Sequence, residues 1–186
     1  MSNIFIISGP SGSGQDSVIN GLKEKISLDK IITTTTRKMR PEDTEGISYY
    51  FISKEEFKRK IQNGDFFEYV IEDNGNYYGG TYAELERAKK STQPVIWKID
   101  YKGVLTAKKI LPEAKSILIY IPIELIESRL KRRGESNKTI KDRLEYAKGW
   151  YANENIFDYK VTNKEGKLEE TIRKVAKIIK ENNIRP

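Results

Sequence analysis

Short apolar runs that alternate with helical patterns organise most of the chain. Runs with strand character cover residues 3–8, 31–35, 94–99, 116–121 and 159–162. Apolar residues recur at helical spacing over residues 14–26, 101–110, 124–133 and 167–180. Strands that alternate with helices form a parallel sheet covered on both faces. The pattern therefore predicts an α/β fold whose ligands bind at the carboxyl ends of the strands.

Two stretches depart from this alternation. Within about 33–91, strand candidates at 45–51, 65–72 and 76–80 surround a helix candidate at 54–63, and Asn74-Gly75 is a hairpin signal. This predicts a small, mostly antiparallel subdomain. The second stretch, about 129–150, is rich in Arg, Lys and Glu, which indicates a mobile helical lid. Both are insertions into a single domain, whose core is residues 1–32, 92–128 and 151–186.

The segment after the first apolar run is nearly a phosphate-binding P-loop. Gly9 and Gly14 have the separation of the two glycines in G-x-x-x-x-G-K-[ST], a loop whose backbone N–H groups surround a phosphate at a helix N-terminus. Gln15 stands where this motif has its lysine, and Asp16 stands where it has the hydroxyl that binds magnesium. The candidate phosphate ligands are Gly9, Ser11, Gly12, Ser13, Gly14, Gln15 and Asp16.

Charge and residue usage narrow the chemistry further. Lys and Arg number 34 against 27 Asp and Glu, and the net charge of +7 favours anionic partners such as phosphates. Because the chain contains neither Cys nor His, thiolate and imidazole chemistry are excluded. Phosphoryl transfer needs neither. We see no basic and aromatic pattern typical of nucleic-acid binding. The chain has no basic, apolar leader and no long apolar run, so we expect a cytoplasmic protein that does not enter a membrane.

A series of short motifs adds a family resemblance. The glycine-rich loop at 8–14 (SGPSGSG) is followed by 33–41 (TTTTRKMRP), 46–51 (GISYYF), 65–69 (DFFEY) and 75–79 (GNYYG). Ile99-Asp100, the arginines between 129 and 143, and Phe157-Asp158-Tyr159 continue the series. In this order the motifs resemble guanylate kinases over nearly the whole chain. The resemblance implies a P-loop kinase core with a parallel sheet flanked by helices, a GMP-binding subdomain and a lid. It also implies transfer of the γ-phosphoryl group of ATP, accompanied by Mg²⁺, to GMP, which gives ADP and GDP.

The resemblance assigns an acceptor site as well. The implied GMP-binding residues are Thr33, Arg37, Arg40, Tyr49, Glu68, Tyr78, Gly79, Thr81 and Asp100. The two arginines and two tyrosines of this set hold the phosphate of GMP, a dianion that suits planar guanidinium groups. Glu68, assisted by Thr33 and Asp100, recognises guanine, whose N1–H and exocyclic amine are neighbouring donors for a carboxylate. Gly80 occupies a position that is Ser or Thr in many relatives, so a polar contact is expected to be lost there, and Thr81 follows immediately.

Three arginines belong to the lid in this resemblance. Arg129 and Arg133 lie four residues apart, on one face of a helix, and Arg143 comes from the next helix. The resemblance implies that all three close over the transferred phosphoryl group and neutralise its charge.

Three departures from the family pattern affect the charge at the phosphates. Gln15 and Asp16 make the loop more negative by two charges, whereas Lys98 replaces a residue that is usually acidic in the family, so the changes cancel. Lys98 lies two residues before Asp100, and strand alternation predicts that both face the same side. We infer that the lysine has moved. Lys98 would contact the phosphates and pair with Asp16, and Asp16 would bind Mg²⁺, for which a carboxylate is a suitable ligand.

Two other functions remain open from the sequence. One is a catalytically impaired module that binds GMP or a phosphorylated partner. The other is a relative that phosphorylates a different phosphate-bearing small molecule, such as a ribose bisphosphate, although the retained Glu68, Thr33 and Asp100 argue against it. The sequence allows either a monomer or a homodimer.

Overall fold

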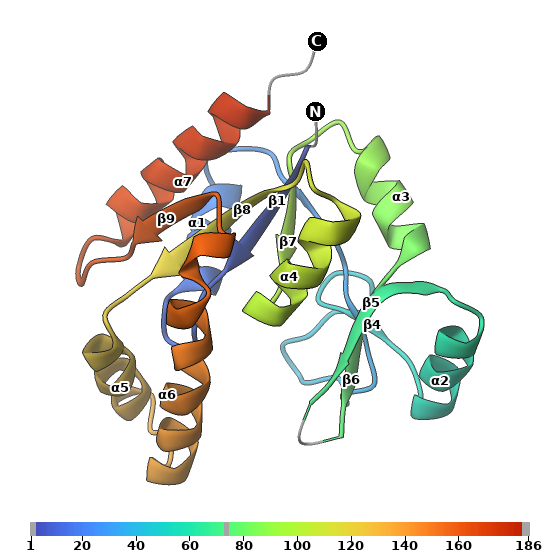
Figure 1. The fold of residues 1–186 in the computed structure, drawn as a ribbon, viewed down its shortest axis with the longest axis horizontal. Helices are drawn as coiled ribbons and strands as arrows, with labels where there is room; N and C mark the ends of the chain where they lie inside the picture. The colour runs from blue at the N-terminus through green and yellow to red at the C-terminus, as the bar shows by residue number, and fades with distance from the viewer. Residues whose placement is uncertain (1–2, 73–74, 184–186) are drawn as a thin grey trace.

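A five-stranded parallel sheet forms the core of the molecule. The computed structural model describes residues 3–72 and 75–183. The strand order is β2-β7-β1-β8-β9, and every neighbouring pair is parallel (Figure 1). The strands are β1 (Ile4–Ser8), β2 (Asp29–Lys30), β7 (Val95–Lys98), β8 (Lys115–Tyr120) and β9 (Tyr159–Thr162). The α/β architecture predicted from the alternating pattern is confirmed.

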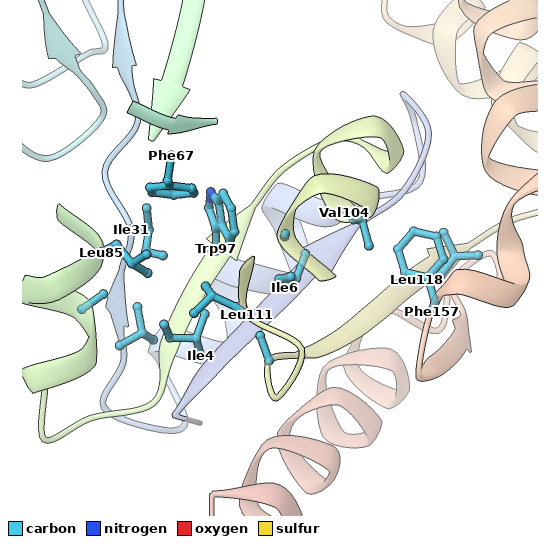
Figure 2. Close-up of a cluster of buried hydrophobic side chains, with 14 of the residues drawn as sticks. Ile4, Ile6, Ile31, Phe67, Leu85, Trp97, Val104, Leu111, Leu118 and Phe157 are labelled. Atoms are coloured by element: carbon cyan, nitrogen blue, oxygen red, sulfur yellow. The ribbon is translucent and has the colours of Figure 1, made fainter. Parts of the chain in front are cut away.

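Helices cover both faces of this sheet, as the alternation of buried residues in β1 requires. Phe5 and Ile7 pack towards α1 (Gln15–Lys23) and α7 (Leu168–Asn182). Ile4 and Ile6 belong to the opposite cluster, with side chains from α3 (Tyr82–Lys90) and α4 (Tyr101–Ile110). Figure 2 shows this second cluster, in which Phe67 lies against Trp97.

A smaller sheet extends from the core, with strand order β4-β3-β6-β5. Its strands are β3 (Thr34–Thr35), β4 (Tyr50–Phe51), β5 (Phe66–Ile71) and β6 (Tyr77–Thr81), and α2 (Lys54–Gln62) packs beside them. Ser53 caps α2, and Phe57 of this helix stacks on Phe66 at a ring separation of 4.2 Å. The sheet is mostly antiparallel, except that β3 and β4 pair in parallel.

Two further helices form what we call the helical arm, α5 (Ile123–Arg132) and α6 (Asn137–Ala152). Ile126, Leu130, Ile140 and Ala147 are buried between them. A short 3-10 helix, η1 (Glu154–Ile156), leads from α6 to β9. In Figure 1 the helical arm and the smaller sheet project from the same side of the core, beyond the carboxyl ends of its strands. Within residues 3–72 and 75–183, no helix has the length and apolar character needed to cross a bilayer.

The structure corrects some of the predicted elements. A single strand over 31–35 is wrong, because the core strand is Asp29–Lys30 and Thr34–Thr35 belongs to the smaller sheet. The chain leaves one sheet and enters the other within this short stretch. Helix α3 was not predicted. The hairpin signal Asn74-Gly75 falls partly outside the described residues, since Asn74 is not among them.

Candidate active site

The glycine-rich loop between β1 and α1 exposes backbone N–H groups at a helix N-terminus. Gly12 and Gly14 have φ angles of 81° and 90°, in the left-handed region that favours glycine. Asn163 Nδ2 donates to the Ser13 carbonyl at 2.8 Å, and Arg129 Nη1 donates to the Gly12 carbonyl at 2.9 Å. Among the described side chains none caps α1. The carbonyls of the loop are therefore occupied, while the first N–H groups of α1 remain suited to an anion.

Gln15 does not reproduce the chemistry of a P-loop lysine. Its Nε2 donates to the carbonyl of Gly9, so the amide is engaged within the loop itself. A neutral amide also supplies no net charge to a phosphate. Ser13 Oγ is buried and has no hydrogen-bond partner among the described residues, which leaves a donor available to a ligand.

Lys98 lies beside the end of the glycine-rich loop, where α1 begins. It is the last residue of β7 and pairs in register with Ile7, which precedes the loop by two residues. Its Nζ lies 2.6 Å from Oδ1 of Asp16, in the first turn of α1. The pairing inferred from the sequence is therefore present. The two side chains are 44% and 78% exposed, so the pair contributes little to stability and its position is what matters. β7 ends at Lys98 and Asp100 caps α4, so the predicted strand alternation does not reach Asp100.

Arg143 contacts the glycine-rich loop, and Arg133 lines the pocket beside it. Arg143 Nη1 donates to Ser11 Oγ at 2.8 Å, which brings α6 onto the loop. Arg133 follows α5 as its C-cap and is exposed. Gly134, at a φ of 75°, then reverses the chain towards α6.

Arg129 is held more tightly than the other two. Besides its bond to the loop, its Nη2 lies 3.0 Å from Oε2 of Glu165, and Arg132 lies 2.8 Å from Oε1 of the same carboxylate. These two guanidinium groups lower the pKa of Glu165. Glu165 and Asn163 carry no sequence signal, because both lie on the loop after β9 and their contacts with the helical arm and the glycine-rich loop are non-local.

A pocket of about 390 Å³ lies between the helical arm and the loop that follows β9. It adjoins the glycine-rich loop through Gly12 and Gly14, and three arginines of α5 and its cap line it. No motif in the sequence had indicated a site for the base of a phosphate donor. The remaining lining residues are Ser17, Asn163, Lys164, Glu165, Gly166 and Leu168.

A cluster on the smaller-sheet side combines cationic and phenolic groups. Arg37 forms a 2.9 Å ion pair with Asp43, and its guanidinium lies 5.2 Å from the ring centroid of Tyr49. The rings of Tyr49 and Tyr78 are 6.0 Å apart. Burial raises the pKa of both phenols, so they keep their protons and can donate to a phosphate. Arg40 is exposed, and its backbone N–H also donates to Asp43, at 2.7 Å.

Two carboxylates form the next cluster, where β5 meets α4. Burial and, secondly, the charge of Asp100 raise the pKa of Glu68 to about 7. Asp100 caps α4, and its Oδ1 accepts from the Gly103 N–H at 2.7 Å. The hydroxyl of Tyr146, on α6, donates to Asp100 Oδ2 at 2.6 Å. Thr33 is half-buried, and its carbonyl accepts from the N–H of Tyr50.

The glycines at the end of β6 are required by close packing. A Cβ at Gly79 would lie 2.8 Å from Phe66, and one at Gly80 would lie 2.4 Å from the ring of Phe67. Phe67 thus fills the space that a side chain at position 80 would need. Thr81 Oγ1 accepts from the Glu84 N–H at 3.2 Å and so caps α3. Its oxygen is therefore used in starting a helix.

Several known proteins resemble this chain in sequence and in fold. The model of the guanylate kinase family matches residues 1–182. The guanylate kinase of Hahella chejuensis is 39% identical over 163 residues, which cover 86% of this chain and 78% of that protein. That of Fusobacterium nucleatum is 35% identical over 184 residues, which cover 98% and 97%. A crystal structure of guanylate kinase from Anaplasma phagocytophilum matches with a TM-score of 0.75 and 27% identity, over 99% of this chain and 88% of that one. The chain therefore belongs to the guanylate kinase family.

Proposed function

We propose that the protein transfers the γ-phosphoryl group of ATP to GMP, forming ADP and GDP, and that Lys98 supplies the positive charge missing from its P-loop. The observation that most supports this is the 2.6 Å contact between Lys98 and Asp16 at the mouth of the loop. It keeps an ammonium group beside the N–H groups of α1, although Gln15 cannot provide one.

On the donor side, the N–H groups of the loop and the Ser13 hydroxyl hold the phosphates of ATP. The 390 Å³ pocket beside the loop accepts the donor base. Magnesium accompanies ATP as part of the substrate. Asp16 is exposed at the start of α1 and offers a hard oxygen ligand that fits this ion. When bound, Mg²⁺ would neutralise part of the negative charge of the phosphates, and Asp16, which also pairs with Lys98, would be the residue that holds it.

On the acceptor side, the smaller sheet (within about 33–91) binds GMP. Arg37, Arg40 and the Tyr49–Tyr78 pair hold its phosphate, with Gly79 close beside. The ionised carboxylate of Glu68 accepts from the N1–H and amine of guanine, and Thr33 and Asp100 complete the base site. The oxygen of the Thr81 hydroxyl already accepts a hydrogen bond that caps α3. Thr81 can therefore contribute to GMP binding only by donating its hydroxyl hydrogen.

Transfer itself is mainly a matter of positioning and charge. An oxygen of the GMP phosphate attacks the γ-phosphorus, and the bond from that phosphorus to the ADP oxygen breaks. Lys98, Arg133 and Arg143 neutralise the oxygens of the transferred group as the predicted lid (about 129–150), which forms part of the helical arm, closes. Arg129 also neutralises these oxygens when its ion pair with Glu165 breaks. While that pair is intact, Arg129 holds the glycine-rich loop through the Gly12 carbonyl.

The engagement of Gln15 with the Gly9 carbonyl favours one alternative function. A loop whose side chain turns inward would bind phosphate weakly, and the acceptor cluster would then serve to bind GMP or a phosphorylated partner without transfer.

The two functions are separated by measuring ADP formation from ATP, Mg²⁺ and sub-millimolar GMP, with AMP as the control acceptor. We expect turnover that depends on GMP and not on AMP. Absence of turnover, with GMP still raising the melting temperature, would overturn the kinase proposal in favour of the binding module.

A further inference from the structure

The acceptor-base cluster contains a residue from the helical arm that none of the family motifs above includes. Tyr146 lies in α6, yet its hydroxyl donates to Asp100 Oδ2 at 2.6 Å. The other oxygen of this carboxylate accepts from the Gly103 N–H at 2.7 Å. Burial and the charge of Asp100 raise the pKa of Tyr146, so the hydroxyl keeps its proton and acts as the donor. Both oxygens of Asp100 are therefore fixed in direction.

The ring of Tyr146 is itself held in place. Tyr101 and Trp150 pack against it at ring separations of 5.7 and 5.2 Å, and Lys102 Nζ lies 5.4 Å from its centroid. Close packing of Tyr101 on α6 depends on Gly149, because a Cβ there would lie 2.4 Å from the Tyr101 ring. Tyr146 is 41% exposed, and these three neighbouring side chains orient its ring.

The same part of α6 is tied to the end of β7. Trp150 Nε1 donates to Ser8 Oγ at 3.1 Å, and Ser8 Oγ donates to the carbonyl of Ile99 at 2.7 Å. This short chain of hydrogen bonds joins α6, the start of the glycine-rich loop and the residue before Asp100. The position of Asp100 relative to Glu68 is consequently set by the arm as well as by the core.

A carboxylate fixed through both oxygens can discriminate between purines. Each oxygen has two lone pairs, so Oδ2 can accept from Tyr146 and from one further donor. Guanine presents an exocyclic amine next to its N1–H, whereas hypoxanthine has the N1–H alone. Glu68 accepts from the N1–H and from one hydrogen of the amine, and the second hydrogen of the amine needs another carboxylate in the correct orientation.

We propose that Tyr146 is a positioning residue that determines acceptor specificity, because its hydroxyl holds Asp100 in the orientation that accepts the exocyclic amine of guanine. This inference rests on the proposed binding of GMP at the Glu68–Asp100 cluster.

The test compares the affinities of GMP and IMP by calorimetry for the wild-type protein and Tyr146→Phe. Removing a hydrogen bond to a charged group should weaken GMP binding about tenfold. IMP lacks the amine, so its Kd should change less than about twofold. Tyr101→Phe is the matched control, since it keeps a ring of the same cluster and the structure gives its hydroxyl no hydrogen bond within the described ranges. It should leave both affinities unchanged.

The outcomes are distinct. Equal loss of GMP and IMP affinity in Tyr146→Phe would mean a merely structural role and overturn the inference, as would unchanged affinity for both. If the wild-type protein binds neither nucleotide, the proposed function itself fails, and the specificity inference fails with it.

Discussion

Replacing Lys98 with alanine should damage phosphoryl transfer far more than it damages acceptor binding. The ammonium lies beside Asp16 and the N–H groups of α1, where the phosphates of the donor would be. The acceptor cluster of Arg37, Tyr49 and Tyr78 is built on other elements and should remain intact. The variant therefore separates the charge at the donor phosphates from the binding of GMP.

The size of the effect follows from the exposure of the side chain. Two unit charges 4 Å apart interact by about 1 kcal/mol in water and about 4 kcal/mol near a protein surface. Because Lys98 is 44% exposed, we take a value between these limits, about 2–3 kcal/mol. This corresponds to a fall in kcat of roughly 30- to 150-fold.

Steady-state kinetics with ATP and GMP measure the effect directly, with GDP as the detected product. Lys89→Ala is a matched control, because Lys89 is also 44% exposed and also pairs with a carboxylate, at 2.8 Å, but lies on α3. The control should keep wild-type kcat. A loss of less than about threefold in Lys98→Ala would contradict this role, since the Lys98 charge would then contribute no more than an ordinary surface charge.

Three further predictions concern the acceptor site, the packing beneath it and the loop. The pKa of Glu68 is raised to about 7, so GMP affinity should rise about tenfold per pH unit below 7 and level off above it. Calorimetry at several pH values measures this affinity. In Glu68→Gln the affinity should no longer depend on pH, except for the change caused by the titration of the GMP phosphate itself. Gly80→Thr should destabilise the protein by about 1–3 kcal/mol in urea unfolding, because its Cβ would meet the Phe67 ring at 2.4 Å. Adding Phe67→Leu should recover most of that loss, and an unchanged deficit would contradict the packing argument. Gly14→Ala should weaken ATP binding in a nucleotide titration without affecting GMP, because position 14 has a φ of 90°. Equal effects on both nucleotides would show that the substitution disrupts more than the loop.

The core fold was predictable from the sequence because its signals are local. The run before the glycine-rich loop, the loop itself and the helix after it are contiguous, and they form β1 and α1 as expected. The split of 31–35 was not predictable in the same way. Ile31 remains bonded to β7 through its N–H, whereas Thr34 pairs with Gly79 of the smaller sheet. A run of β-branched residues indicates a strand without saying which sheet it joins.

In the candidate site, too, contacts between residues of recognisable motifs could be predicted, and contacts between other residues far apart in the sequence could not. The pairing of Lys98 with Asp16 could be inferred because both departures occur in motifs whose places in the fold are defined. The contacts of Arg129 with Glu165, and of Tyr146 with Asp100, join positions 36 and 46 residues apart. Nothing in the spacing of these residues indicates that they meet. Only the packing of the helical arm on the core brings them together.

The most direct test of the relocated charge is to move it back. The measurement is kcat for GDP formation by Lys98→Ala and by the double variant that also contains Gln15→Lys, which restores the lysine of the P-loop motif. We predict that the double variant has a kcat at least about tenfold higher than that of Lys98→Ala, because either lysine supplies the same charge to the phosphates. A double variant no faster than Lys98→Ala would contradict the claim that Lys98 replaces the P-loop lysine.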